Sequence, residues 1–259
     1  MRAYDAIAPD FDRHRTLPAG VAEAVRSAIL AAALPARPRI LDLGAGSGRL
    51  GHAFVADGDD YTGLDLSFGM LSAFAARTPD RRLVQADGTA LPFADASFDA
   101  VLLIQVLSSA RQWRALLNQA IRVLRPAGAL IVGRVVAPQD GIDAQMKSRL
   151  AEILGAMDIH PYRDKPRDDA LSWLARTMPD PHTVTAAAWT TLRTPAAFLE
   201  RHAGGSRFAT LPDSIKQQAM RRLAAWAAER VGPLGTAVAE PHRFELTIFR
   251  QGTRHAPAR

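Results

Sequence analysis

The stretch that decides the fold is ILDLGAGSGRLG, residues Ile40–Gly51. Its first four residues are apolar apart from Asp42 and stand between Pro38 and Gly44, which predicts a short buried strand. The glycines that follow allow positive φ and a close approach of a ligand to the backbone. Residues 49–56 are expected to form a helix, whose N-terminus offers free N–H groups. A strand, a glycine loop and a helix in this order are typical of a nucleotide-binding site.

Apolar runs with strand character alternate with amphipathic segments along most of the chain. The expected strands are residues 39–43, 60–66, 83–86, 98–106, 129–136, 183–192 and 243–250. The expected helices are residues 21–34, 49–56, 67–77, 113–124, 140–157, 170–178, 195–202 and 212–231. Residues 125–128 (RPAG) are expected to form a turn, and residues 160–169 an exposed loop.

This alternation predicts the fold class. Strands separated by helices pair in parallel, and both faces of their sheet are covered. RFELTIFR, residues 243–250, instead alternates apolar and polar side chains, as an antiparallel or edge strand does. We therefore predict a single domain of α/β type over residues 1–259, with a doubly wound, Rossmann-like, mostly parallel seven-stranded sheet and an antiparallel C-terminal strand. Ligands of such sheets bind beyond the carboxyl ends of the strands.

Of two carboxylates near the loop, Asp42 distinguishes between cofactor classes, whereas Asp65 favours adenosine-type ligands generally. Gly46, Gly48 and Gly51 fit the G-x-G-x-x-G pattern of dinucleotide-binding proteins, but Asp42 lies just before the loop and would repel a pyrophosphate. An amine or a sulfonium is a better partner for Asp42. Asp65, at the end of the second strand, can accept both hydroxyls of a ribose. The alternatives are that Asp42 is a structural hydrogen-bond hub and that Asp65 caps a helix.

Asp87 follows the third strand and can accept a hydrogen bond from the exocyclic amine of adenine, although it can also cap its own loop. Apolar side chains near these two strand ends can provide a slot for the adenine ring; they are Leu66, Met70, Ala86 and Leu91. The three carboxylates together favour a ligand that carries an adenosine and a cationic group.

Four stretches resemble a known family in order and spacing: LDLGAGSGRLG, YTGLDLS, VQADGTALPFADASFDAVLLIQVL and RVLRPAGALIV, within residues 40–136. The chain resembles the class I S-adenosylmethionine-dependent methyltransferases, and among them the small-molecule group similar to the ubiquinone/menaquinone biosynthesis methyltransferases. The resemblance implies S-adenosylmethionine as cofactor and S-adenosylhomocysteine as product. One departure is Ala127, because RPGG is usual where this chain has RPAG.

The resemblance also implies roles for single residues, all in cofactor binding. Gly44, Ala45 and Gly46 would wrap the methionine moiety, with Asp42 at its amino group; Asp65 would hold the ribose; Leu66 and Met70 would flank the adenine, with Asp87 and Gly88 at its edge; and Gln105 would border the methionine and the acceptor opening. It further implies an N-terminal lid, residues 1–20, in which Tyr4 and Arg15 close over the cofactor.

The same resemblance divides the chain into a cofactor-binding core, residues 36–136, an acceptor-side insertion after the fifth strand, residues 137–192, and a C-terminal part, residues 193–250. It implies methyl transfer to a small-molecule acceptor, with oxygen, nitrogen and carbon all open as the methylated atom. Such a transfer is an in-line displacement that depends on positioning, so no catalytic base is assigned. The alternatives are an RNA or protein methyltransferase and a cofactor-binding, non-catalytic homologue.

Composition excludes several other classes. The net charge is +6, but the arginines are scattered, which argues against a nucleic-acid partner. IQVLSS after the fourth strand lacks the proline and the aromatic residue that base-modifying enzymes need, which argues against amino-group methylation of adenine. There is no cysteine, and the seven histidines lack ligand spacing, so we expect no metal. No apolar run is long enough to span a membrane, so the cytoplasm is expected. The sequence leaves the oligomeric state open.

Overall fold

The structure is a computed structural model, and it describes residues 17–32, 35–78, 82–160, 166–178, 180–203, 208 and 211–250. Tyr4 and Arg15, the two lid residues expected at the cofactor, lie outside the described residues. Among the described residues, no helix is both long enough and apolar enough to cross a membrane.

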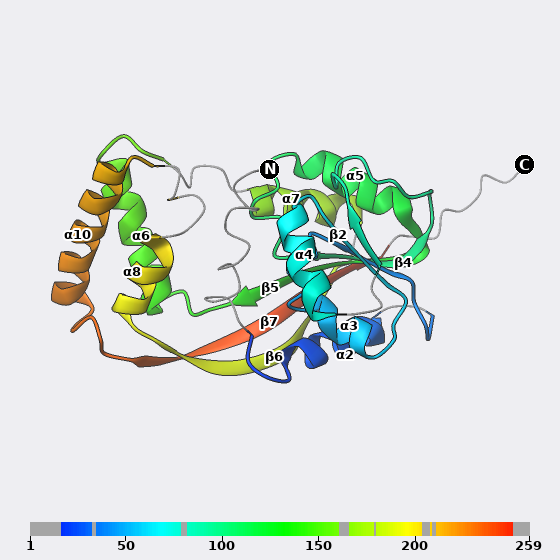
Figure 1. The fold of residues 1–259 in the computed structure, drawn as a ribbon, viewed down its shortest axis with the longest axis horizontal. Helices are drawn as coiled ribbons and strands as arrows, with labels where there is room; N and C mark the ends of the chain where they lie inside the picture. The colour runs from blue at the N-terminus through cyan, green and yellow to red at the C-terminus, as the bar shows by residue number, and fades with distance from the viewer. Residues whose placement is uncertain are drawn as a thin grey trace, which may run out of the picture. The chain divides into compact units, whose positions relative to one another are not determined.

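A seven-stranded sheet organises the fold (Figure 1). Its order is β3-β2-β1-β4-β5-β7-β6. The strands are β1 Ile40–Leu43, β2 Tyr61–Asp65, β3 Arg82–Gln85, β4 Phe98–Ile104, β5 Leu124–Val136, β6 His182–Arg193 and β7 Val238–Arg250. The β1–β2, β2–β3, β1–β4 and β4–β5 pairs are parallel, and the C-terminal strands are antiparallel. The predicted doubly wound, mostly parallel sheet is confirmed.

The chain groups into two compact units. Unit 1 comprises residues 1–135, 165–187 and 244–259, and unit 2 comprises residues 136–164 and 188–243. The helices of unit 1 are α2 Val21–Ala32, α3 Gly51–Ala56, α4 Phe68–Arg77, α5 Trp113–Val123 and α7 Pro166–Thr177. Those of unit 2 are α6 Ile142–Gly155, α8 Pro195–Ala203 and α10 Asp213–Arg230. Residues 137–192, the expected insertion, are therefore shared between the two units.

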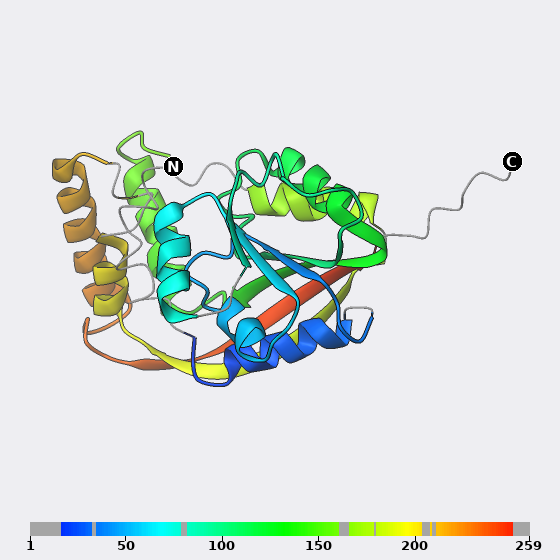
Figure 2. The same ribbon diagram turned by 45° about the vertical axis from the view of Figure 1, so that its right-hand side comes forward.

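In unit 1 the sheet lies between two helical layers. Helices α5 and α7 lie on one face and α2 and α3 on the other in both views (Figures 1 and 2). The central strand β4 is buried along nearly its whole length, because a parallel strand covered on both faces has no solvent side. This explains why residues 98–104, FDAVLLI, are all apolar except Asp99.

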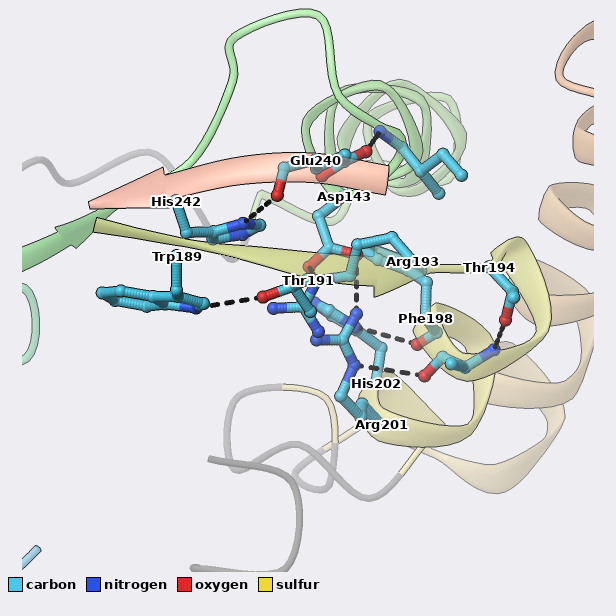
Figure 3. A network of polar contacts seen from close by, with 12 residues as sticks. Asp143, Trp189, Thr191, Arg193, Thr194, Phe198, Arg201, His202, Glu240 and His242 are labelled. Carbon is cyan, nitrogen blue, oxygen red and sulfur yellow. Dashed lines mark hydrogen bonds and ion pairs between the residues drawn. The ribbon is translucent and has the colours of Figure 1, made fainter. Parts of the chain in front are cut away.

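Polar contacts at the start of α6 join this helix to other elements of unit 2 (Figure 3). The Glu240 carboxylate on β7 accepts the N–H of Ile142 at 2.6 Å. Asp143, in the first turn, accepts from Arg201 of α8 at 2.6 Å and lies 3.6 Å from Nε of Arg193 at the end of β6. Carboxylates at a helix N-terminus complement its positive end. These contacts tie α6 to both long strands and to α8.

Three boundaries differ from the sequence prediction. Helix α7 begins at Pro166, inside the stretch expected to be a loop, because proline suits a first turn and two aspartates follow it there. Strand β7 begins at Val238 rather than at residue 243. The RPAG segment lies inside β5 instead of forming a turn before it, at a register irregularity against β4 between Phe98 and Ala100.

Ala127 carries the strain of that irregularity. Its φ is 64°, in the left-handed region, where a Cβ is unfavourable and glycine is not. We expect Ala127→Gly to raise the free energy of unfolding by about 0.5–1 kcal/mol. This is the free energy that the left-handed conformation costs an alanine, minus the additional conformational entropy that a glycine loses on folding. Chemical denaturation measures the change. Ala129→Gly, two residues on in the buried part of the same strand, is the control and should destabilise. Equal destabilisation by both variants would contradict the prediction.

Candidate functional site

The loop after β1 turns through glycines with positive φ. The φ values of Gly44, Gly46 and Gly48 are 82°, 58° and 81°. Gly44 also passes close to the segment after β4: a Cβ on it would lie 2.9 Å from Cγ2 of Val106. Only glycine meets both conditions, so the loop crosses the carboxyl ends of β1 and β4 with its backbone bare. This is the close approach that the sequence pattern predicts.

Most N–H groups of this loop have partners within the protein. Those of Gly44 and Ala45 both donate to the carbonyl of Leu64, at 2.8 and 3.0 Å. Gly46 donates to Oδ2 of Asp65 at 2.9 Å, and Gly48 to the carbonyl of Ala45 at 3.1 Å. A pyrophosphate site needs such groups to face the ligand. The loop therefore lacks the donor set of a dinucleotide site, in agreement with the position of Asp42.

Asp65 anchors the loop to the end of β2. Besides Gly46, its carboxylate accepts the N–H of Ser67 at 2.9 Å. The sequence left open whether Asp65 caps the next helix. In the structure the N-cap of α4 is Ser67, whose Oγ accepts the N–H of Met70 at 3.2 Å. Each carboxylate oxygen has two lone pairs, so an oxygen that holds a backbone N–H can also accept a ribose hydroxyl. The anchoring role and the expected ribose role are compatible.

The residues expected around adenine are unevenly placed. Leu66 is 44% exposed beside Asp65, whereas Met70 is 2% exposed and packs into the core. Asp87 is exposed, and its carboxylate accepts from the N–H and hydroxyl of Thr89 at 2.8 and 2.7 Å, which lowers its pKa. Phe68, which the sequence analysis did not select, is 65% exposed. The exposed apolar surface at this strand end comes from the residues on both sides of Ser67.

Asp42 is buried beneath the glycine loop. Its Oδ2 accepts the hydroxyl of Tyr61 at 2.7 Å, and its Oδ1 has no hydrogen-bond partner in the part of the chain that the structure describes. Burial raises the pKa of Asp42 to about 6; the Tyr61 hydrogen bond lowers it, and the charge of Asp65 raises it. Burial, the Asp42 charge and the hydrogen bond all raise the pKa of Tyr61, which therefore stays a neutral donor.

Gln105 marks the other rim of the loop. Its φ is 56°, which is unusual for a residue other than glycine, and residues with such backbone angles are frequent at functional sites. Its N–H donates to the carbonyl of Gly133 at 2.9 Å. Arg49, on the far side of the glycine loop, donates to Oε1 of Gln105 at 2.7 Å. This hydrogen bond links Arg49, which follows the glycine loop, to Gln105, which follows β4.

The structure brings Asp42, the glycine loop, Asp65 and Gln105 together at the carboxyl ends of β1, β2 and β4, and it places Asp87 and Gly88 after β3. Two residues of this site escaped the sequence analysis. Tyr61 lies at the start of β2 and reads as an ordinary strand residue, and Arg49 reads as the first turn of a helix. Both residues reach the site only through their long side chains, and no rule based on sequence spacing predicts such a reach.

The comparisons with known proteins identify the family of the chain. Residues 41–132 match the family described as Methyltransferase domain. An uncharacterized methyltransferase of Mycobacterium tuberculosis is 32% identical over 194 residues, which is 73% of this chain and 74% of the relative. Demethylmenaquinone methyltransferases of Renibacterium salmoninarum and Beutenbergia cavernae are 36% and 43% identical, over 53% and 41% of this chain. The chain spans 59% and 45% of these two relatives, about half of their length.

Solved structures support the fold. A SAM-dependent methyltransferase from Thermotoga maritima aligns with a TM-score of 0.53 at 14% identity, covering 96% of this chain and 99% of the other. The YcgJ protein from Bacillus subtilis aligns with a TM-score of 0.57 at 19% identity, covering 89% and 99%. At these identities the likeness shows the fold alone.

The raised pKa of Asp42 predicts a pH-dependent effect of Asp42→Asn on stability. A carboxyl whose pKa is about 6 in the folded protein and 3.8 in the unfolded chain favours folding while protonated, and this contribution is lost as the pH rises from 4 through 6. Asp42→Asn has no such loss. The unfolding free energy of the variant minus that of the wild type should therefore rise between pH 4 and 7 by on the order of 3 kcal/mol. Chemical denaturation at several pH values measures it.

Asp87→Asn is the matched control of opposite sign. The pKa of Asp87 is lowered in the folded protein, so its contribution is present above pH 4 and lost as the pH falls. The same difference should then fall as the pH increases towards 4 and change little between pH 4 and 7. Parallel pH profiles for the two variants would contradict the assignment of a buried, charge-penalised carboxyl to Asp42.

Proposed function

The chain belongs to the S-adenosylmethionine-dependent methyltransferases, and we propose that it transfers the methyl group of this cofactor to a small-molecule acceptor. The observation that carries the proposal is one oxygen of Asp42, a buried carboxylate atom without a hydrogen-bond partner among the described residues, beside a glycine loop most of whose N–H groups are already bonded. A buried polar atom without a partner is costly, and a cationic ligand group removes the cost. The ammonium of the methionine moiety is such a group.

The residues present fit the remaining parts of the cofactor. Gly44, Ala45 and Gly46 leave the backbone open to the methionine chain, and Asp65 stands where a ribose would meet the end of β2. Leu66 offers apolar surface to the adenine, with Asp87 and Gly88 at its edge. Arg49, held by Gln105 at the rim of the loop, is a cation for the carboxylate.

The bound cofactor would supply a methyl group already activated by the positive sulfur. The chain then has to hold the donor in line with the acceptor and exclude water, which is positioning rather than acid–base catalysis. We assign no general base, because a base is needed only if the acceptor loses a proton. We place the acceptor-selecting residues in 137–192, which lie beyond the family-matched residues 41–132, and we place the reaction in the cytoplasm.

The relatives suggest which acceptor to test first. Several are named demethylmenaquinone methyltransferases, although the chain spans only about half the length of those two compared above. Their name makes demethylmenaquinone the leading small-molecule candidate.

Cofactor binding is tested by calorimetric titration with S-adenosylhomocysteine and, separately, with NAD. We expect micromolar affinity for the first and none for the second, because the glycine loop lacks the donor set of a pyrophosphate site. Asp65→Ala should abolish binding, since it removes both the ribose acceptor and the anchor of Gly46. Asp158→Ala, at an exposed carboxylate of unit 2, is the control and should bind like the wild type. A well-folded wild type that does not bind S-adenosylhomocysteine would refute the proposal.

The acceptor class is tested with S-adenosylmethionine carrying a labelled methyl group. The purified protein is incubated with demethylmenaquinone, with and without a reductant, and in parallel with total RNA and with cell protein. We expect label in the organic extract of the first reaction and none in RNA or protein. Label in RNA or protein would favour the alternative acceptors, and binding without any transfer would favour a non-catalytic homologue.

A further inference from the structure

Tyr61 lies in an unusual place for a hydroxyl. The residue is buried, and its ring stacks on Phe54 with centroids 5.3 Å apart and lies tilted against Phe74 at 6.2 Å. Phenylalanine would fill an aromatic cluster of this kind without a polar atom to satisfy. A buried hydroxyl costs free energy unless it is hydrogen-bonded, and the partner of this one is Oδ2 of Asp42 at 2.7 Å.

The surrounding backbone leaves room for that hydroxyl. Gly51, at the start of α3, has no side chain where the phenol oxygen lies, and a Cβ there would overlap both Tyr61 Oη and the ring of Phe74. The last glycine of the GxGxxG-like spacing therefore serves the phenol rather than a phosphate. The site thus combines a phenol, a glycine that admits it and a carboxylate that receives it.

We propose that Tyr61 is a positioning residue: its phenol holds one oxygen of Asp42 and so directs the other oxygen to the ammonium group of the cofactor. This inference rests on the proposed function. With Oδ2 bonded to Tyr61, Oδ1 is the oxygen that has no partner among the described residues. Without the phenol, the carboxylate can rotate about its Cβ–Cγ bond, and its geometry toward the ammonium is no longer defined.

Among the described residues, the groups that act on Asp42 include no cation. In the sheet it is flanked by Gly63 of β2 and Leu102 of β4, neither of which is charged. The charges and titratable groups that act on it are Tyr61 and Asp65, a neutral donor and a second carboxylate. A ligand cation therefore meets two carboxylates there. 5′-Methylthioadenosine, a fragment of the cofactor without the amino acid, has no ammonium group for Asp42 to bind.

This arrangement predicts pH-dependent binding. Affinity for S-adenosylhomocysteine should fall as the pH decreases through the pKa of Asp42, about 6, because a protonated carboxyl no longer attracts an ammonium. The Tyr61 hydrogen bond stabilises the carboxylate and lowers that pKa. Loss of the phenol should move the midpoint to higher pH, an effect that a purely structural tyrosine would not have.

The experiment compares two ligands by calorimetry. S-adenosylhomocysteine carries the ammonium, and 5′-methylthioadenosine carries the same adenosine and sulfur without the amino acid. We expect Tyr61→Phe to weaken S-adenosylhomocysteine binding about tenfold, as for loss of a hydrogen bond to a charged group. Binding of 5′-methylthioadenosine should stay within about twofold by the same reasoning. The pH midpoint for S-adenosylhomocysteine should rise.

Two further variants keep the test independent of packing. Asp42→Asn should give the same ligand-selective loss, and adding Tyr61→Phe to it should cost little more, since the two residues act as one unit. Phe54→Leu disturbs the aromatic stack without removing the phenol, so it should lower stability but leave the affinity ratio of the two ligands unchanged.

Four outcomes would overturn the proposal. Equal weakening of both ligands by Tyr61→Phe would mean that Tyr61 only supports the fold, and an unchanged pH midpoint would mean that it does not act through Asp42. A wild type that binds 5′-methylthioadenosine and S-adenosylhomocysteine equally would mean that Asp42 does not meet the ammonium. A wild type that binds neither would refute the proposed function itself, and this inference with it.

Discussion

The structure depends on how the loop after β1 is fastened to the end of β2. Two successive N–H groups, of Gly44 and Ala45, share the carbonyl of Leu64, and a third, of Gly46, goes to the Asp65 carboxylate. This fastening requires the adjacent, parallel register of β1 and β2, and it requires glycine where Val106 approaches from the segment after β4. The loop therefore has one shape, set by the sheet, and the side chains around it are placed by three strands rather than by the loop itself.

Most of the fold could be predicted from the sequence because its signals are local. Buried parallel strands such as β4 read as apolar runs, glycines follow β1 where φ must be positive, and Asp42 and Asp65 stand at strand ends where a topological rule brings them together. The start of α7 and the strain at Ala127 could not be predicted. Proline and alanine are each compatible with several local structures, among them a loop, a turn, a helix start and a bulge. Backbone geometry, rather than residue type, decides between those readings.

The residues of the site that lie at strand ends could be predicted from the sequence, and those that reach it through long side chains could not. A carboxylate at a strand end is placed by its backbone, so spacing predicts it. The phenol of Tyr61 and the guanidinium of Arg49 reach their partners, Asp42 and Gln105, from 19 and 56 residues away in the chain through long side chains. Whether such a side chain reaches the site depends on the space around it. For Tyr61 this space exists because residue 51 is a glycine. The adenine contact of Met70 stays a prediction, and its side chain is 2% exposed in the structure.

The two long C-terminal strands have a consequence for how this protein can be divided. β6, residues 182–193, and β7, residues 238–250, each pass from one compact unit into the other without interruption. At these two crossings the border between the units falls within a strand rather than in a linker. Recombination at that border would cut hydrogen-bonded ladders, so unit 2 is not a module that can be exchanged whole between homologues. Diversity in this part of the chain has to arise by substitution, or by insertion into the connections between its helices, while the strands are inherited with the sheet.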